Sequence, residues 1–218
     1  MGKNVLVVAA TPKEIQPFLD NVRQSAGLVA GHTIDVLISG VGLTSATYHL
    51  TRQVFLKRPQ FIIQAGIAGC FTKNTVLGSV AVVRQDCIAD EAVMESGKLK
   101  TVFDLRLNSA GKFPFSGGWL INENVILKKL PHTKVRAISV NHITTSEKMI
   151  ELYRKKFNPA IESMEGAALQ YVALSEKIPF IQLRAVSNYI GERDKKRWHM
   201  KEAIVNLNND ITAVLNIL

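Results

Sequence analysis

Apolar residues along this chain form short continuous runs, separated by amphipathic stretches. The runs at residues 5–10 (VLVVAA), 61–68 (FIIQAGIA) and 179–187 (PFIQLRAVS) are nearly continuous, which is typical of strands buried on both faces. Stretches between the runs repeat apolar residues at helical spacing. We predict strands at residues 4–10, 32–39, 61–68, 76–89 (one or two strands), 135–140, 160–162 and 179–187, and helices at residues 11–22, 43–57, 122–129, 146–156, 164–176 and 195–218.

Strands and helices alternate over the whole length, without an internal repeat or a linker. This order predicts one α/β domain over residues 1–218, a three-layer α/β/α sandwich around a central mixed, mostly parallel sheet. Residues 95–119 carry mixed signals interrupted by Gly and Pro, so we expect an irregular excursion there with no regular element. Ligands of such folds bind at the carboxyl ends of strands, which makes the polar residues after each strand the first candidates for function.

Composition excludes several classes of protein. Of the 218 residues, 47% are apolar and 21% charged, which excludes a disordered chain. No apolar run approaches the roughly 18 residues of a membrane span, and Pro12, Lys13 and Glu14 end the first run earlier than in a secretory signal. Cys70 and Cys87 form neither a CxxC pair nor a zinc-site pattern, so we expect a cytoplasmic protein without a bound metal.

The net charge of +9 allows a nucleic acid, a membrane surface or an anionic small molecule as partner. Much of the excess lies in residues 193–201 (RDKKRWHMK). Base-stacking aromatic residues are not interleaved with this run, apart from Trp198. We therefore expect a small-molecule substrate and no nucleic-acid or membrane partner, and a nucleic-acid-binding module is the remote alternative.

The polar residues that follow the predicted strands have structural explanations as well as functional ones. Residues 11–14 (TPKE) have the pattern of a helix capping box, so Glu14 can stabilise a helix start or act in catalysis. Glu165 stands near a helix start, where the helix dipole favours a carboxylate. Asn188 can form a turn or cap a helix. Residues 66–69 (GIAG) can be a tight turn or a place where a ligand approaches the backbone.

Together these segments match the motifs of the nucleoside phosphorylase and nucleosidase superfamily. The resemblance runs from Val5 to about Leu215, through VLVVAATPKEI at the start, SGVGLTSA at 39–46, IIQAGIAG at 62–69, ESMEGAAL at 162–169 and PFIQLRAVSN at 179–188. It implies the nucleoside phosphorylase-like form of the sandwich and cleavage of the N-glycosidic bond between a ribose and a base, with no cofactor.

The resemblance implies water, and not phosphate, as the nucleophile. The hexameric-type phosphorylases of the superfamily carry Gly-Asp-Pro-x-Arg after the first strand and Arg-x-Gly-Ser at the third, where this chain reads AATPKE and QAGI. By similarity, Glu14 is the carboxylate that activates water and stabilises an oxocarbenium-like transition state. By the same resemblance, Glu165 accepts hydrogen bonds from the ribose hydroxyls and Met164 lies against the sugar. Ile67 and Ala68 are expected to bind the substrate, and Arg184 to anchor the carboxylates.

Asn188 indicates which base leaves. The methylthioadenosine and adenosylhomocysteine nucleosidases, which the chain also resembles, have an Asp at this place that protonates adenine at N7. An amide cannot act as such an acid, but it can donate a hydrogen bond to O6 or N7 of a purine. Asn188 therefore favours hypoxanthine over adenine. Ile143 stands where those nucleosidases place an aromatic side chain, and we expect it to contact the base.

Residues 187–194 (SNYIGERD), followed by Trp198, resemble the futalosine hydrolases, a branch of the superfamily that acts in menaquinone biosynthesis. Those enzymes split futalosine into hypoxanthine and dehypoxanthine futalosine, and the substrate tail ends in a benzoate. A guanidinium suits a carboxylate, so Arg193 is the first candidate to bind the tail, ahead of residues 195–197. The resemblance implies this reaction in a homodimer or higher homo-oligomer, with adenine release from methylthioadenosine or adenosylhomocysteine as the alternative.

Overall fold

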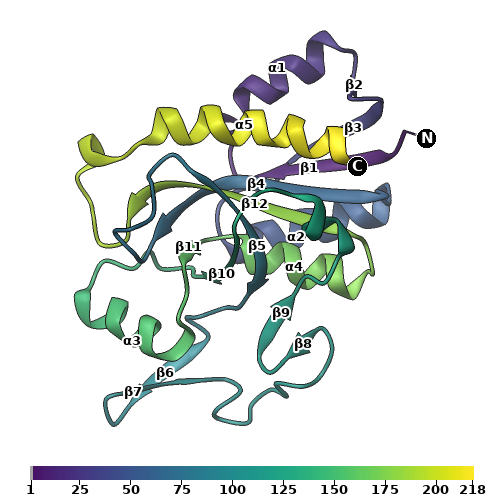
Figure 1. The fold of residues 1–218 in the computed structure, drawn as a ribbon. Coiled ribbons are helices and arrows are strands. Elements are labelled where there is room, and N and C mark those ends of the chain that lie inside the picture. The colour runs from purple at the N-terminus through teal and green to yellow at the C-terminus, as the bar shows by residue number, and fades with distance from the viewer. Residues whose placement is uncertain (1) are drawn as a thin grey trace.

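Ten strands form one mixed sheet in the computed structural model, which describes residues 2–218 (Figure 1). Along the sheet the order is β2 (Leu28–Val29), β3 (His32–Ile38), β1 (Asn4–Ala9), β4 (Phe61–Cys70), β11 (Ile161–Ser163), β10 (Lys134–Ser139), β5 (Val80–Asp86), β9 (Trp119–Ile121) and β8 (Phe115–Ser116), and β12 (Phe180–Tyr189) pairs with both β4 and β5.

The long central strands run parallel: β1 pairs with β3 and β4, and β12 pairs with β4. Antiparallel pairs join β12 to β5, β11 to β4, and the short strands at the two edges. The predicted α/β fold with a central mixed sheet is confirmed. Its consequence for function is that β1, β4 and β12 all end at the same edge.

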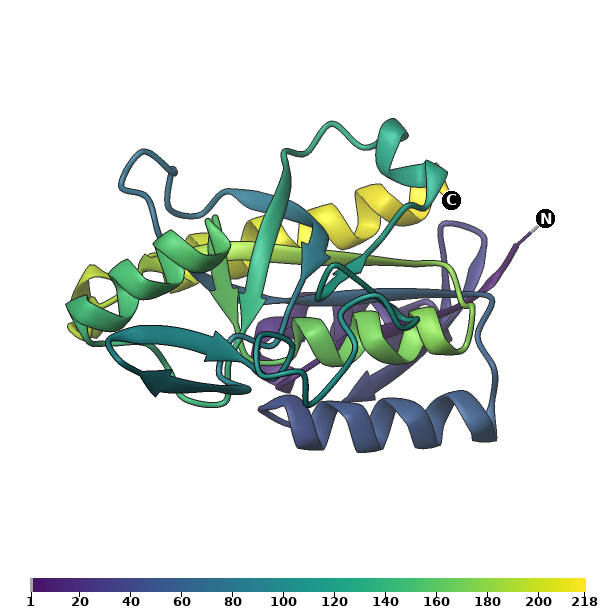
Figure 2. The same ribbon diagram turned by 90° about the horizontal axis from the view of Figure 1, so that it is seen from below.

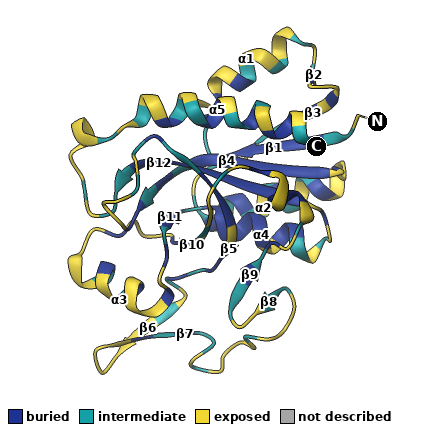
Figure 3. Ribbon diagram, viewed as in Figure 1, coloured by how far each residue is buried: buried dark blue, intermediate teal, exposed yellow. Residues whose placement is uncertain are grey.

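Helices cover both faces of the sheet, as Figure 2 shows from a second direction. Helices α1 (Gln16–Gln24) and α5 (Met200–Ile217) lie on one face, and α2 (Leu43–Leu56) and α4 (Gly166–Ser175) lie on the other. Alternation along β1 explains both layers, because Val5 and Val7 pack in the same apolar cluster as α1 and α5, whereas Leu6 and Val8 pack in the cluster of α2 and α4. Figure 3 shows the result, with buried strands between helices that expose their outer faces.

The remaining helix, α3 (Glu147–Phe157), lies apart from these two layers, beside β6 (Ala92–Glu95) and β7 (Lys98–Thr101) (Figure 1). Its buried face packs in a separate apolar cluster through Ile150, Tyr153 and Phe157. Within residues 2–218, the helices are too short or too polar to cross a membrane.

Two predicted helices are interrupted in the structure. Residues 11–22 fold as a 3₁₀ turn, η1 (Pro12–Glu14), followed by α1. A continuous helix is excluded because Pro17 lacks an N–H and its ring would clash with the carbonyl of Lys13. The last helix is likewise divided into η3 (Lys195–Arg197) and α5, because the N–H of His199 donates to the Ser187 carbonyl of β12 at 2.8 Å.

The prediction of no regular element at residues 95–119 is wrong. Strands β6 and β7 form an antiparallel hairpin, and β8 pairs with β9. Ser96 and Gly97 both adopt positive φ values at the tip of the first hairpin. These strands are short, and β6 and β8 contain no buried residue, so they lack the apolar runs that predict buried strands. The helix expected at 122–129 is a 3₁₀ turn, η2 (Val125–Lys129).

A β-bulge changes the alternation of β12 near its end. Val186 pairs with Ala68, but the next pair along β4 is Asn188 with Gly69, so Ser187 is an extra residue without a partner in the ladder. The side chain of Asn188 therefore lies beside Gly69, where a Cβ would come within 3.4 Å of the amide nitrogen of Asn188. Gly69 provides the space for this amide.

Candidate active site

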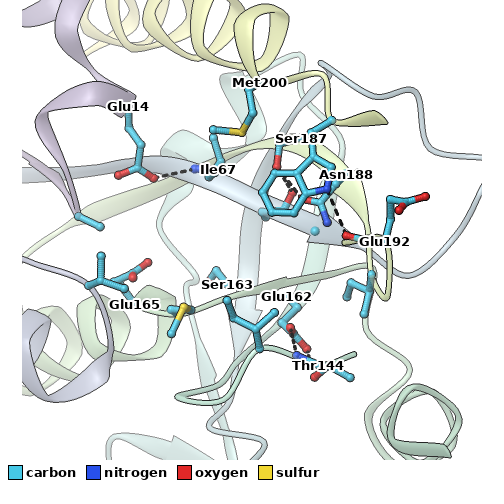
Figure 4. Close-up of a pocket in the computed structure, with 18 of the residues that line it drawn as sticks. Glu14, Ile67, Thr144, Glu162, Ser163, Glu165, Ser187, Asn188, Glu192 and Met200 are labelled. Atoms are coloured by element: carbon cyan, nitrogen blue, oxygen red, sulfur yellow. Dashed lines mark hydrogen bonds between the residues drawn. The ribbon is translucent and has the colours of Figure 1, made fainter. Parts of the chain in front are cut away.

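A cavity of about 320 Å³ opens at the carboxyl ends of β1, β4, β11 and β12 (Figure 4). It forms where the sequence analysis expected a site. Eight of the nine predicted site residues line it: Glu14, Ile67, Ala68, Ile143, Met164, Glu165, Asn188 and Arg193. The ninth, Arg184, is fully buried and contacts a carboxylate of the lining.

Glu14 both caps a turn and faces the cavity. Its Oε2 accepts hydrogen bonds from the Thr11 N–H at 2.9 Å and the Thr11 hydroxyl at 3.1 Å. Its Oε1 accepts from the N–H of Ile67 at 3.1 Å. The Glu14 carbonyl accepts in turn from the Asn208 amide of α5 at 2.9 Å. Capping and catalysis, the two interpretations of the sequence, are therefore compatible, because the cap fixes the carboxylate at the cavity wall.

Arg184 connects Glu165 to the interior of the sheet. One guanidinium nitrogen, Nη1, lies 3.4 Å from Glu165 Oε2, and the other, Nη2, donates to Gln64 Oε1 at 2.9 Å. The second oxygen of Glu165 accepts from the N–H of Gly42 at 3.1 Å. Glu165 is thus held on both oxygens, by a buried cation and by the backbone at the start of α2.

Gly66 makes room for this arrangement. A Cβ at this position would lie 2.5 Å from Arg184 Nη1 and 3.0 Å from Glu14 Oε1. Gly66 stands inside β4, which continues to Cys70, so the tight turn that the sequence suggested at residues 66–69 does not form. The glycine is required by side chains that meet above the strand.

The amide of Asn188 is oriented by its neighbours on β12. Its Oδ1 accepts from the Ser187 hydroxyl at 2.8 Å, and its Nδ2 donates to the Tyr189 carbonyl at 3.0 Å. An amide nitrogen has two hydrogens, so one remains for a ligand. Figure 4 shows Asn188 across the cavity from Glu14 and Glu165.

The loop after β10 forms the wall below Asn188. Asp90 holds this loop by accepting hydrogen bonds from the N–H groups of Asn141 and His142. Thr144, two residues further, donates from its N–H and its hydroxyl to the two oxygens of Glu162, at 3.0 and 2.5 Å. Burial raises the pKa of Glu162, and the two bonds from Thr144 oppose that effect.

Only one residue of the basic segment 193–197 lines the cavity. Arg193 does so, whereas Arg197 pairs with Glu192 at 3.1 Å on the surface. Glu192 also lines the cavity, and its pKa is lowered, first by a hydrogen bond from the Asp194 N–H and then by Arg197. The Trp198 indole donates to the Glu192 carbonyl at 3.1 Å, which fixes this segment over the cavity.

A buried carboxylate supports the site from behind. Asp86 is fully buried, and its oxygens accept from the Ser139 hydroxyl at 3.0 Å and the Gln182 amide at 3.1 Å. Burial raises the pKa of Asp86 to about 6. The Ser139 hydroxyl accepts from the N–H of Ala167 at 2.8 Å, so this network holds the start of α4, directly after Glu165.

Sequence reasoning missed part of the cavity wall. Glu162 looked like a strand-end residue, and the contributions of Met200 and Ile204 from α5 were not foreseen. Met200 and Ile204 reach the cavity through long-range packing of α5, which no local sequence pattern predicts. Among residues 2–218 there is no group of three or more His, Cys, Asp or Glu side chains that could hold a metal ion.

Comparisons with known proteins identify the family of this chain. Residues 4–218 match the phosphorylase superfamily. A futalosine hydrolase from Streptomyces coelicolor is 26% identical over 193 residues, which cover 84% of this chain and 79% of that protein. A 5'-methylthioadenosine/S-adenosylhomocysteine nucleosidase from Halalkalibacterium halodurans is 24% identical over 201 residues, covering 88% and 84%.

The fold has close counterparts among solved structures. The 5'-methylthioadenosine/S-adenosylhomocysteine nucleosidase from Helicobacter pylori with butyl-thio-DADMe-Immucillin-A superimposes with a TM-score of 0.80 at 17% identity, over 100% of both chains. That identity supports a common fold only. Since the family match covers nearly every residue, the chain belongs to the phosphorylase superfamily.

Proposed function

We propose that this protein hydrolyses the N-glycosidic bond of futalosine and releases hypoxanthine. The observation that carries the proposal is the placement of the polar groups in the cavity: the carboxylates of Glu14 and Glu165 lie on one side and the amide of Asn188 lies on the other (Figure 4). A ribose between the carboxylates would place its base at the amide.

Glu14 would activate the attacking water. Three donors from Thr11 and Ile67 fix its carboxylate at the cavity wall, as general-base catalysis requires. As the bond to the base breaks, positive charge develops on the sugar, and the adjacent carboxylate stabilises it. The water gives its proton to Glu14 and its oxygen to the anomeric carbon, and the base leaves with the electron pair.

Glu165 would bind the ribose hydroxyls. Both of its oxygens are oriented from behind, by Arg184 and by the Gly42 N–H, and each keeps acceptor capacity towards the cavity. Met164 lines the cavity next to it and offers an apolar contact to the sugar ring.

Asn188 would stabilise the leaving base. Hypoxanthine departs with negative charge spread onto O6, and the free N–H of the amide can donate there or to N7. The Ser187 hydroxyl and the Tyr189 carbonyl fix which end of the amide is the donor.

Arg193 would bind the carboxylate at the end of the futalosine tail. It lines the cavity and forms no ion pair within residues 2–218, so its guanidinium is free to bind a carboxylate. Glu192 beside it is neutralised by Arg197, which reduces repulsion of an anionic tail.

Adenine release from methylthioadenosine or adenosylhomocysteine is the second candidate. A nucleosidase of that name matches this chain almost as closely as the futalosine hydrolase does. Asn188 argues against this candidate, because an amide cannot protonate N7 of adenine.

The test is to incubate the purified protein with futalosine, inosine and methylthioadenosine, with and without phosphate, and to identify the released base by chromatography. Release of hypoxanthine from futalosine without phosphate supports the proposal. Adenine from methylthioadenosine would establish the second candidate, and a requirement for phosphate would make the protein a phosphorylase. The phosphate arm matters because Lys13 also lines the cavity.

Glu14→Gln is the matched inactive variant for this assay. It keeps the size of the side chain but removes the base, so we expect turnover to fall about 10²- to 10⁴-fold. The new amide nitrogen would face the N–H of Thr11 or of Ile67, so the unfolding free energy should also fall, by about 1–3 kcal/mol. Asp20→Asn, an exposed change on the neighbouring helix α1, is the control. Turnover of Glu14→Gln equal to that of the unchanged protein would contradict the assignment.

We further propose a homo-oligomer in a reducing cytoplasm. Helix α2 exposes Tyr48, Phe55 and Leu56, which a second copy could cover. Cys70 and Cys87 are free thiols, as expected in a reducing compartment. Analytical ultracentrifugation measures the oligomeric state directly.

A further inference from the structure

Glu162 is a buried carboxyl group of the cavity that the mechanism above does not use. It stands on β11, is 7% exposed and lines the same cavity as Asn188. Burying a carboxylate is costly unless the group is hydrogen-bonded. The cost suggests that its acceptor atoms are needed here.

The carboxyl group is held in one orientation. Thr144 donates to both oxygens, from its N–H to Oε1 and from its hydroxyl to Oε2. The loop that carries Thr144 is itself fixed by Asp90 through two backbone N–H groups. Each carboxylate oxygen can accept more than one hydrogen bond, so acceptor capacity remains after Thr144 is satisfied.

Glu162 lies at the base end of the cavity. Figure 4 shows it on the side of Asn188 and away from Glu14 and Glu165. Ile143 and Ile190 also line the cavity and supply the apolar contacts that a flat ring needs. An amide donor, a carboxylate acceptor and apolar side chains therefore line the same cavity.

The amide of Asn188 and the carboxylate of Glu162 together complement a 6-oxopurine and not adenine. The six-membered ring of a 6-oxopurine presents an acceptor at O6 beside a donor at N1–H, whereas adenine presents a donor at N6 beside an acceptor at N1. A carboxylate accepts from N1–H but repels the lone pair of adenine N1. A buried polar group left unpaired in this way gives strong discrimination.

We propose that Glu162 is a specificity-determining residue that binds the N1–H of a 6-oxopurine while Asn188 binds the other polar atoms of the base. This inference rests on the proposed function, because it assigns the oxopurine end of the same cavity. It extends recognition of the base from Asn188 alone to the pair of Asn188 and Glu162.

The test is the specificity ratio, kcat/KM for inosine divided by kcat/KM for adenosine, in the unchanged protein and in Glu162→Gln. Loss of a charged acceptor should lower kcat/KM for inosine about 10- to 100-fold. Adenosine should lose little or gain, since the amide introduced there can donate to N1. The ratio should therefore fall at least about tenfold.

Two control variants distinguish a direct contact of Glu162 with the base from its structural role in holding the loop that carries Thr144. Thr144→Val removes one of the two bonds that orient Glu162 but keeps the carboxylate, so it should lower the ratio less than Glu162→Gln does. Glu151→Gln makes the same chemical change on the surface of α3 and should alter neither rate. An unchanged ratio in Glu162→Gln, or an equal change in Thr144→Val, would overturn the inference.

A measurement on the unchanged protein serves if Glu162→Gln fails to fold. Methylation of inosine at N1 removes the hydrogen that Glu162 accepts, so inosine should be cleaved at least about tenfold faster than 1-methylinosine. Equal rates would overturn the inference while futalosine hydrolysis stands. Adenine as the sole base released would instead remove the proposed function, and with it the oxopurine site.

Discussion

Asn188 has two differently bonded ends, and this asymmetry decides what a substitution there would do. The Ser187 hydroxyl donates to Oδ1, whereas Nδ2 donates to the Tyr189 carbonyl. A carboxyl group in this place would keep the first contact but would set its second oxygen against a carbonyl oxygen.

Asn188→Asp should shift the preference towards adenine nucleosides. The Tyr189 carbonyl disfavours the charged form of the new carboxyl group and so favours a protonated acid that can serve N7. We expect the ratio of adenosine to inosine cleavage to rise about tenfold or more, as measured by base release. Asn206→Asp is the control, because that amide also donates to a carbonyl, that of Gly78, and lies outside the cavity. An unchanged ratio would show that the base is read elsewhere.

Arg193→Ala tests the contact with the substrate tail. We expect KM for futalosine to rise about tenfold or more, with little change for inosine, which has no tail. Lys195→Ala removes a neighbouring charge that does not line the cavity, so it controls for a general loss of positive potential. Equal effects on the two substrates would exclude Arg193 from the tail site.

At the scale of an element, strand β4 does more than build the sheet. Its Gly66 leaves the space in which Arg184 and Glu14 approach one another, and its Gly69 leaves the space for Asn188. A strand interior with two glycines is weaker than one with β-branched residues. Here the two glycines lower the stability of the strand but leave the space that the side chains of the active site need.

Gly66→Ala should impair catalysis through this geometry. The added methyl group would meet Arg184 Nη1 at 2.5 Å, so the guanidinium or the strand must move. Displacement of Glu14 and Glu165 by about 1 Å lowers turnover about 100-fold, and the strain costs roughly 1–3 kcal/mol of unfolding free energy. Gly111→Ala, with open space around it, is the control, and both quantities follow from steady-state kinetics and urea unfolding.

The elements that carry the site were more predictable than those at the periphery. Buried strands such as β1, β4 and β12 have continuous apolar runs, and their ends collect Glu14 and Asn188 by topology alone. The hairpin of β6 and β7 was missed because its two strands have only four residues each and lack such runs. The break before α1 follows from Pro17, whose position in the sequence could have indicated it.

At the scale of the molecule, the contacts that complete the site are long-range. Arg184 reaches Gln64 from 120 positions away, and the distant Asn208 of α5 holds the turn that carries Glu14. The resemblance to a family assigned roles to Glu165 and Arg184, but physical patterns in the sequence did not. Neither the resemblance nor the sequence patterns assigned a role to Glu162, because it lies on β11 whereas its partner Thr144 lies on the loop after β10.

The buried network around Asp86 makes the stability of the whole molecule depend on pH. Burial raises the pKa of Asp86 from 3.8 to about 6, so between these values the folded protein keeps a proton that the unfolded chain releases. This group therefore adds stability as pH falls from 7 towards 4, on the order of 3 kcal/mol, and that contribution is lost as pH rises through about 6.

Asp86→Asn should remove this dependence. The unfolding free energy of the unchanged protein minus that of Asp86→Asn should increase when the pH is lowered from 7.5 to 5, as measured by denaturant unfolding at each pH. Asp20→Asn, at an exposed site on α1, should follow the unchanged protein. A difference that shrinks on acidification would mean that Asp86 stays charged in the folded state.

The bulge in β12 makes chain length at this point as important as residue type. If the ladder continued without the bulge, Ser187 would pair with Gly69, and the amide of Asn188 would stand opposite Cys70, whose side chain packs in an apolar cluster with Val83 and Ile161. The extra residue therefore keeps this amide at the cavity and out of the core. During divergence, this strand can exchange side chains and so change the base that is recognised, as long as the bulge is kept.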